Sequence, residues 1–363
     1  MKSITVTTHR SINYGAVLQA YALQQAQEWL GVENLLLDIP PEKDMYEPLT
    51  GKFSKRTLIS MMVNLSWMFY SRDMKLLVDR FNQFVNENIK TTKVYRSWNE
   101  LLRDPPEADM YINGSDQVFG LRGKYDDMRM LRFGSETIKR FSFAASLGEY
   151  DWSDEEKRMF AELLQRFSMV SVREKYAKEY IESFSDVNCE VNIDPVFLLD
   201  KEQWSEMAVN PFIKEKYILC YPLVGNSDTQ KVLNQLKEKT GYRIVSVQTI
   251  PIKRIKADEY ILNAGPKEFL GLIKNAEYIV TTSFHGTVFS LIFEKPFYTL
   301  IKNYKSQRMT DLLKLVDLDK RLYTQQKSIG TEIPDFTYSK KVINIEKKKS
   351  LDYLSRVIKS VEA

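Results

Sequence analysis

Short runs of β-branched and aromatic residues alternate with helix-like segments along most of this chain, and that alternation limits the folds open to it. Such runs predict buried strands, which fall at 3–8, 35–39, 108–112, 140–144, 169–172, 190–193, 217–221, 242–247, 278–280 and 297–301. Amphipathic segments such as 14–30, 154–166 and 227–239 separate many of the strands. Because parallel strands need crossover connections, usually helices, the pattern predicts an α/β fold with parallel sheets.

The chain, at 363 residues, is longer than one hydrophobic core usually supports. Its strand–helix rhythm loosens between Phe197 and Lys216, where Asn210-Pro211 indicates a turn. The predicted units are an N-terminal α/β domain at 1–205, a C-terminal α/β domain at 206–340 and an amphipathic helix at 341–363 that packs back on the first domain. Two Rossmann-like domains facing a cleft form a glycosyltransferase-B-like layout, although periplasmic-binding and other twin α/β layouts fit the same pattern.

The charge and the cysteine content limit which partners and which cellular compartment are expected for this protein. The 52 basic and 48 acidic residues are interspersed, and a net charge of +4 does not favour a nucleic-acid partner. Cys189 and Cys220 lack metal-binding spacing, which indicates a reducing compartment. With two histidines far apart, we expect neither a metal nor a cofactor. No apolar run reaches ~18 residues and the chain begins directly in a strand, so we expect a cytoplasmic protein without a signal peptide.

Residues 276–297 contain the most informative turn of the sequence. The stretch begins with a β-branched and aromatic run and ends with an apolar run, as a buried strand followed by a buried helix would. Ser283 is a suitable helix cap, and His285 and Gly286 follow it. Ligands of open α/β sheets bind outside the carboxyl ends of strands, where a helix start favours an anion. We therefore expect chemistry at His285, and we interpret the other histidine, His9, as structural.

Other polar residues also follow predicted strands. Parallel strands end at one edge of a sheet, so these side chains are expected on one rim. They are His9, Asn13, Tyr14, Gly15, 114–117, Ser146, Arg173, Asp194, Ser283, His285 and Arg308.

The motifs at these positions resemble those of the polysaccharide pyruvyl transferase family. The most specific are NYGAVLQAYAL at 13–23 and SFHGT at 283–287, the latter followed by Lys295-Pro296-Phe297. The others, in the order typical of the family, are GSDQ at 114–117, SFAASLG at 142–148, VSVRE at 170–174, Asp194-Pro195, and Arg308 ahead of Leu312-Leu313.

This resemblance implies a metal-independent transfer of a pyruvyl group from phosphoenolpyruvate, the donor substrate, to two hydroxyls of a sugar in a bacterial-type surface polysaccharide or its precursor. A cyclic ketal is the product. Such a reaction needs a general acid, cations for phosphate and carboxylate, and a base for the hydroxyls. His285 suits the acid role and Arg173 a bidentate hold on an anion, whereas Asp194 and Asp116 are alternatives for the base.

The resulting prediction has three catalytic residues, His285, Arg173 and Asp194. Substrate contacts are predicted from Asn13, Tyr14, Gly15, Gln19, Ser115, Asp116, Gln117, Ser146, Ser283, Gly286 and Arg308. Structural alternatives exist for several of these. Arg173 could pair with Glu174 at a helix start, Arg308 could be a surface charge, and Ser283 could be a cap only.

Two other functions fit the same architecture. One is a glycosyltransferase that uses a nucleotide-sugar donor, and the other is a non-catalytic glycan-binding relative. The sequence does not fix whether the acceptor is lipid-linked, nucleotide-linked or polymeric, and a homo-oligomer is left open.

Residues 51–80 combine a run rich in methionine and aromatic residues with basic flanks. The run is too short to span a bilayer, but it could lie peripherally at the inner face of a membrane and present lipid-linked sugars. The alternative is a helix that packs on the N-terminal sheet or at an interface between copies of the chain.

Overall fold

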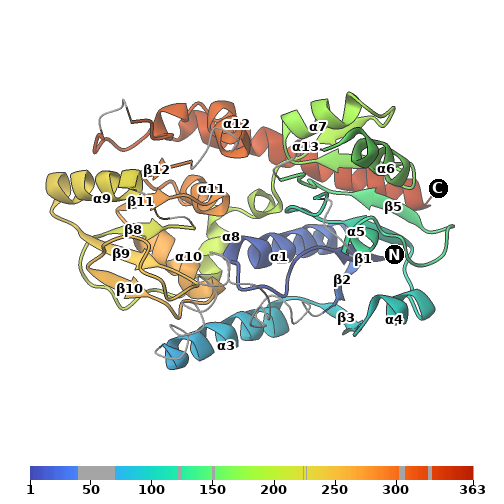
Figure 1. The fold of residues 1–363 in the computed structure, drawn as a ribbon, viewed down its shortest axis with the longest axis horizontal. Helices are drawn as coiled ribbons and strands as arrows, with labels where there is room; N and C mark the ends of the chain where they lie inside the picture. The colour runs from blue at the N-terminus through green and yellow to red at the C-terminus, as the bar shows by residue number, and fades with distance from the viewer. Residues whose placement is uncertain are drawn as a thin grey trace, which may run out of the picture.

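The computed structural model describes residues 1–39, 70–120, 125–148, 152–223, 225, 227–301, 307–325 and 329–362. Two five-stranded sheets lie at opposite ends of the molecule, with helix α1 (Tyr14–Trp29) and helix α8 (Lys201–Met207) between them (Figure 1). Below, the N-terminal half means the elements up to β7 (Cys189–Val191), and the C-terminal half means β8 (Tyr217–Tyr221) to α12 (Gln307–Leu315).

The sheet of the N-terminal half has the strand order β3-β2-β1-β4-β5, and all its neighbouring strands are parallel. These strands are β1 (Lys2–Val6), β2 (Glu33–Asp38), β3 (Thr91–Val94), β4 (Met110–Asn113) and β5 (Lys139–Ser142). The parallel pair β6 (Val170–Val172) and β7 (Cys189–Val191) continues this sheet beyond β5 through isolated bridges such as the one between Ala145 and Val172.

The sheet of the C-terminal half repeats this order as β10-β9-β8-β11-β12, again parallel throughout. Its strands are β8 (Tyr217–Tyr221), β9 (Arg243–Val247), β10 (Glu259–Ile261), β11 (Tyr278–Thr281) and β12 (Phe297–Thr299). Numbered within each sheet, both orders read 3-2-1-4-5, which is typical of Rossmann-like sheets and confirms the predicted α/β class. The strand order changes direction between β1 and β4 in one sheet and between β8 and β11 in the other. Such sheets bind ligands at these switch points.

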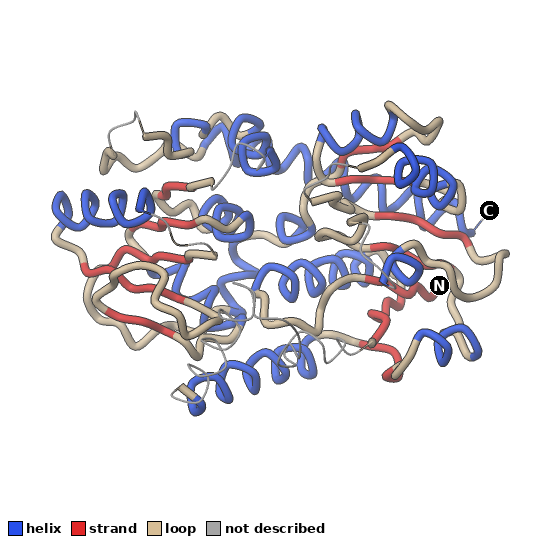
Figure 2. The backbone as a smooth tube through the Cα atoms, viewed as in Figure 1, coloured by secondary structure: helices blue, strands red, loops and turns tan. Residues whose placement is uncertain are grey.

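Helices connect the strands and surround both sheets (Figure 2). They are α3 (Ser71–Asn88), α4 (Trp98–Arg103), α5 (Tyr125–Arg129), α6 (Asp154–Leu164), α7 (Lys175–Glu182), α9 (Ser227–Thr240), α10 (Pro266–Asn275), α11 (Phe284–Ile292), α12 (Gln307–Leu315) and α13 (Thr337–Glu362), with 3₁₀ helices at Pro195–Leu198 and Asp319–Arg321.

Helix α13 returns to the N-terminal half, as predicted. The hydroxyl of Tyr353 donates to the carbonyl of Ser142 at 2.9 Å, and Ser350 Oγ accepts from the N–H of Ile193 at 3.0 Å. The helix begins at Thr337, ahead of the predicted start at 341. Its first two turns are largely exposed and carry few apolar residues, so the sequence shows no helical periodicity there.

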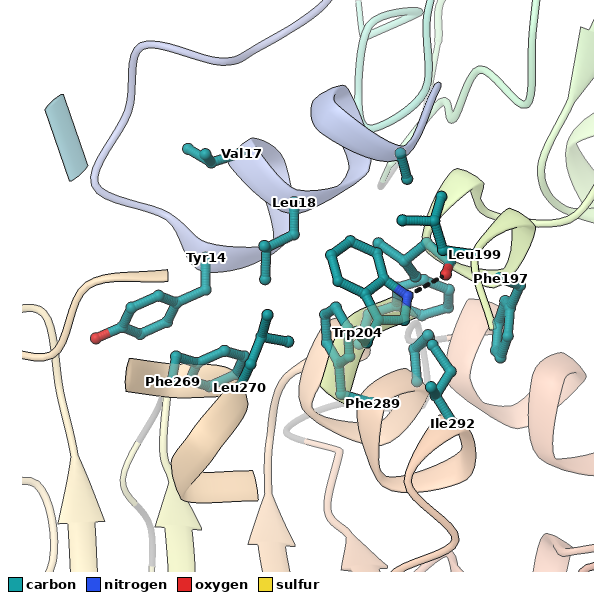
Figure 3. Packing of buried hydrophobic residues seen from close by; sticks show 14 of the residues in the cluster. Tyr14, Val17, Leu18, Phe197, Leu199, Trp204, Phe269, Leu270, Phe289 and Ile292 are labelled. Carbon is teal, nitrogen blue, oxygen red and sulfur yellow. Dashed lines mark hydrogen bonds between the residues drawn. The ribbon is translucent and has the colours of Figure 1, made fainter. Parts of the chain in front are cut away.

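One hydrophobic core joins the two halves (Figure 3). Tyr14, at the start of α1, stacks on Phe269 of α10 with ring centroids 4.2 Å apart, and its hydroxyl donates to the carbonyl of Ala264 at 2.8 Å. Trp204 of α8 is fully buried and packs edge-on against Phe289 of α11. Burial of each large aromatic side chain stabilises the arrangement by roughly 2–3 kcal/mol, so the position of one half against the other is fixed by packing.

Helix α3 adds a polar contact between the halves. Arg80 Nη1 donates to the carbonyl of Asn263 at 2.7 Å, and Arg80 Nε lies 3.2 Å from a carboxylate oxygen of Glu268. Most of the predicted membrane segment, 51–69, lies outside the described residues, and its last part enters α3. In the described ranges, every helix is too short or too polar to cross a bilayer.

Two strands were absent from the sequence prediction, and both lie at sheet edges. β3 reads Thr-Thr-Lys-Val and β10 reads Glu-Tyr-Ile, and neither contains a fully buried residue. An edge strand needs no apolar run, because one of its two edges has no neighbouring strand and is open to solvent. The predicted domain boundary at 205 falls within α8, between the last strand of one half and the first of the other, and it stays a prediction.

Candidate active site

His285 lies at the carboxyl edge of the second sheet, where β11 gives way to α11 beside β8. Ser283 caps α11 by accepting from the N–H of Gly286 at 3.3 Å. Gly286 packs so closely on Thr281 that an added Cβ would overlap the threonine side chain. These contacts hold the helix start in place and leave His285 only 8% exposed.

The first turn of α1 packs directly on the His285 ring. A Cβ added at Gly15 would overlap the imidazole, so only glycine fits this position. Asn13 caps α1 by accepting from the N–H of Gly15 at 3.1 Å. The starts of α1 and α11 therefore come together at His285, and both helix dipoles place positive potential there.

A buried carboxylate connects His285 to an arginine. Arg173 Nη1 donates to Asp194 Oδ2 at 2.6 Å, and the same oxygen lies 3.5 Å from His285 Nε2. Asp194 Oδ1 accepts from the N–H of Val196 at 3.1 Å. Burial alone would raise the pKa of Asp194, but the charges of His285 and Arg173 outweigh burial and hold that pKa well below its usual range. Asp194 therefore stays ionised and compensates both partners.

Glu174 provides the second carboxylate that contacts Arg173. Arg173 Nε donates to Glu174 Oε1 at 2.9 Å, and Ser146 Oγ donates to the same oxygen at 2.8 Å. Burial would lower the pKa of Arg173, but the carboxylates of Glu174 and Asp194 raise it above its usual value. Arg173 Nη2 and Glu174 Oε2 are buried and have no hydrogen-bond partner among the described residues. A ligand could satisfy this donor and this acceptor.

Arg308, in the first turn of α12, brings a second guanidinium to the site. Its Cζ lies 5.6 Å from the ring centroid of Phe284, and Cζ of Arg173 lies 4.5 Å from the same centroid. Burial lowers the pKa of Arg308, and the positive charge of Arg173 lowers it further. Partly buried cations normally have a carboxylate partner, so this arrangement favours an anionic ligand.

Gln19 and Ser115 form a separate polar group at the switch point between β1 and β4. Gln19 Nε2 donates to Thr7 Oγ1 at 2.9 Å, and Thr7 Oγ1 donates to the carbonyl of Ser115 at 2.9 Å. Gln19 Oε1 and Ser115 Oγ are buried without a partner in the described part of the chain. Gln19 follows Gly15 by one helical turn, so this group lies on the face of α1 that reaches His285.

Three other predicted substrate contacts, Tyr14, Asp116 and Gln117, have partners elsewhere in the chain. Tyr14 lies in the core between the halves, and its hydroxyl is engaged, so it is not among the polar groups around His285. Asp116 has a left-handed backbone (φ 72°) and forms a bridge with Ala145. A Cβ added at Gly148 would lie 2.9 Å from the side chain of Gln117, so these two residues pack together.

His9 sits beside a different carboxylate. Its Nδ1 lies 3.1 Å from the carbonyl of Thr7, and its Nε2 lies 3.7 Å from Asp38, which Arg10 also contacts at 2.5 Å. These contacts agree with a structural role for His9.

Two residues of the site were not proposed from sequence. Glu174 was considered only as a structural partner of Arg173, although its position directly after a strand was a usable signal. Phe284 is apolar and carried no signal, because its role depends on arginines that are distant in sequence. Within the described ranges, no three His, Cys, Asp or Glu side chains are grouped to hold a metal ion.

Two Rossmann-like sheets with a buried histidine and two arginines where the halves meet define an α/β protein with a candidate anion site. Residues 13–303 match the family described as polysaccharide pyruvyl transferase, and the chain therefore belongs to that family of transferases. No curated protein matches the chain.

Several solved structures are similar to the chain at low sequence identity. UDP-GlcNAc 2-epimerase from Methanocaldococcus jannaschii is 14% identical, with 95% of this chain and 99% of that chain covered and a TM-score of 0.46. The enzyme of that name from Neisseria meningitidis, bound to UDP-GlcNAc, is 12% identical, with 99% of each chain covered and a TM-score of 0.47. The S. aureus MnaA–UDP co-structure is 14% identical, with 96% of each chain covered and a TM-score of 0.49.

The depressed pKa of Asp194 predicts a loss of stability in acid. Its folded-state pKa lies below the unfolded value of about 3.9, so unfolding takes up a proton as the pH falls below about 4. We expect Asp194→Asn to remove this contribution and to reduce the dependence of the unfolding free energy on pH between about 2 and 4, by up to about 1.4 kcal/mol per pH unit. Urea titrations at several pH values measure it. An unchanged pH dependence would show that Asp194 titrates normally in the folded protein.

Proposed function

We propose that this protein transfers the pyruvyl group of phosphoenolpyruvate to a sugar of a surface polysaccharide or its precursor and forms a cyclic ketal. The observation that carries the proposal is the group around His285. An imidazole paired with an ionised, buried carboxylate lies near two guanidiniums, and that of Arg308 makes no ion pair with a carboxylate of the described residues. A proton donor beside cations suits a substrate that must be protonated and that carries both phosphate and carboxylate.

The reaction begins with a proton from His285 to the methylene carbon of phosphoenolpyruvate. The methylene becomes a methyl group, and C2 becomes a cation that a sugar hydroxyl attacks. The bond between C2 and the phosphate oxygen then breaks, and the second hydroxyl closes the ring on C2. Of the two hydroxyl protons released, one restores His285 and the other leaves with phosphate, so the overall reaction balances. The ionised Asp194 stabilises the protonated imidazole at the start of each cycle.

The cations and the helix starts support binding of the donor. The Nη2 of Arg173, which has no partner among the described residues, and the guanidinium of Arg308 provide hydrogen-bond donors for anionic oxygens. The N-termini of α1 and α11, which come together at His285, add positive potential.

The base for the sugar hydroxyls is a carboxylate other than Asp194 in this proposal. Both oxygens of Asp194 already accept hydrogen bonds, and its depressed pKa makes it a poor proton acceptor. Glu174 Oε2 has no partner among the described residues, so Glu174 is a candidate for the base in addition to Asp116.

Thermal stability with added ligands separates this proposal from its alternatives. We expect phosphoenolpyruvate to raise the melting temperature, because it binds only the folded state. Stabilisation by nucleotide sugars alone would support the glycosyltransferase alternative. Stabilisation by glycans alone would support a non-catalytic glycan-binding protein.

Removal of the proposed acid should abolish turnover without abolishing donor binding. We expect His285→Ala to lower phosphate release from phosphoenolpyruvate, in the presence of unpyruvylated acceptor glycan, by at least about 10²-fold. Calorimetric titration with phosphoenolpyruvate and a melting curve are the controls, and both should stay close to wild type. Near-normal turnover by the folded variant would make His285 a structural residue.

A lysine at position 173 should weaken donor binding because it loses the fork geometry of arginine. We expect Arg173→Lys to keep one contact with a carboxylate but to lose Nη2, and to raise the dissociation constant for phosphoenolpyruvate at least about tenfold. The matched control is Arg356→Lys, which changes an exposed bidentate pair with Glu190. Equal affinities for the two variants would remove Arg173 from the donor site.

A further inference from the structure

Phe284, the first residue of α11, has its ring beside Arg173, Arg308 and His285. Its ring lies within cation–π distance of Arg173, at 4.5 Å, and of Arg308, at 5.6 Å. The His285 ring meets it edge-on, with centroids 5.3 Å apart and planes at 89°. Phe284 is only 5% exposed, so its position is fixed by the core beneath it.

The two guanidiniums around this ring are in different electrostatic situations. Arg173 has the carboxylates of Asp194 and Glu174 as partners. Arg308 has neither a hydrogen bond nor an ion pair with any described residue. Burial and the positive charge of Arg173 act against its charge, and the carboxylates of Glu174 and Asp116 offset this only in part, from beyond ion-pair distance. An aromatic face attracts a guanidinium by about 0.5–2 kcal/mol without neutralising its charge. A carboxylate at position 284 would hold Arg308 more strongly, but it would also compete with an anionic ligand.

We infer that Phe284 positions Arg308 beside Arg173 as a cation without an ion-pair partner among the described residues. The two arginines together bind the phosphate and the carboxylate of one phosphorylated carboxylic acid. This inference rests on the proposed function, and it identifies Phe284 as the residue that positions the two arginines for the donor. A ligand with a single anionic group would leave either Arg308 or the Nη2 of Arg173 without a partner among the described residues. Phe284 is therefore a positioning residue, since it acts through Arg173 and Arg308.

Fluorinated phenylalanines at position 284 test this inference without changing the shape of the ring. Each added fluorine withdraws electron density from the ring face and weakens its attraction for a cation. We expect the dissociation constant for phosphoenolpyruvate, measured by calorimetric titration, to rise stepwise with the number of fluorines, to about tenfold for the fully fluorinated ring. The same series at Phe289 is the control, because that ring packs on Trp204, Phe269 and Phe293.

Ordinary substitutions provide a second measurement. Phe284→Leu should bind phosphoenolpyruvate about tenfold more weakly than wild type, whereas Phe284→Tyr should stay within about threefold. Phe289→Leu removes a ring from the same helix and should change stability but leave affinity unchanged.

The outcomes separate this inference from the function on which it rests. Equal affinity across the fluorinated series, or equal affinity of Phe284→Leu and Phe289→Leu, overturns the role of Phe284 while the donor stays phosphoenolpyruvate. A wild-type protein that does not bind phosphoenolpyruvate overturns both. A stepwise loss at position 284 only, rescued by tyrosine, supports the inference.

Discussion

The packing of the first turn of α1 on the His285 ring is the contact on which the site depends. Gly15 and His285 are 270 positions apart and belong to helices of different halves, α1 and α11, yet the backbone of one touches the imidazole of the other. No larger residue fits at position 15. The packing of the two halves and the orientation of the His285 ring therefore depend on the same contact. The aromatic core around Tyr14, Phe269 and Trp204 maintains it.

The electrostatics of the site follow from the burial of its charged side chains. Removing charges from water costs several kcal/mol for each ion, and this cost is offset only where partners and hydrogen bonds are well placed. Arg173 and Asp194 meet this condition, because each makes more than one polar contact. Arg308 makes no such contact with a described residue, and the ring of Phe284 lies against it. In the described part of the chain, the fold therefore holds Arg173 between two buried carboxylates and leaves Arg308 without an ion-pair partner.

Both halves use the same topology, but they contribute different chemistry. In the N-terminal half, the switch point between β1 and β4 collects the neutral polar atoms of Gln19 and Ser115. In the C-terminal half, the switch point between β8 and β11 carries His285, while its charged neighbours Arg173 and Asp194 follow β6 and β7 on the other sheet. Neutral hydrogen-bonding groups suit sugar hydroxyls and charged ones suit an anionic donor, so the group at Gln19 and the group at His285 suit different parts of the proposed reaction.

The sequence by itself determined the α/β class, most central strands, the return of the last helix and the turn that carries His285. These features arise from local periodicity and from cap residues such as Ser283, which act over a few neighbouring positions. The edge strands β3 and β10 and the first turns of α13 left no such pattern, because they are not buried on both sides. Only the tertiary structure decided that Gly15 faces His285, that Asp194 joins His285 to Arg173, and that Phe284 lies between two arginines. Those contacts join residues that are far apart in sequence, and their energies depend on packing and burial, which no single segment of the chain encodes.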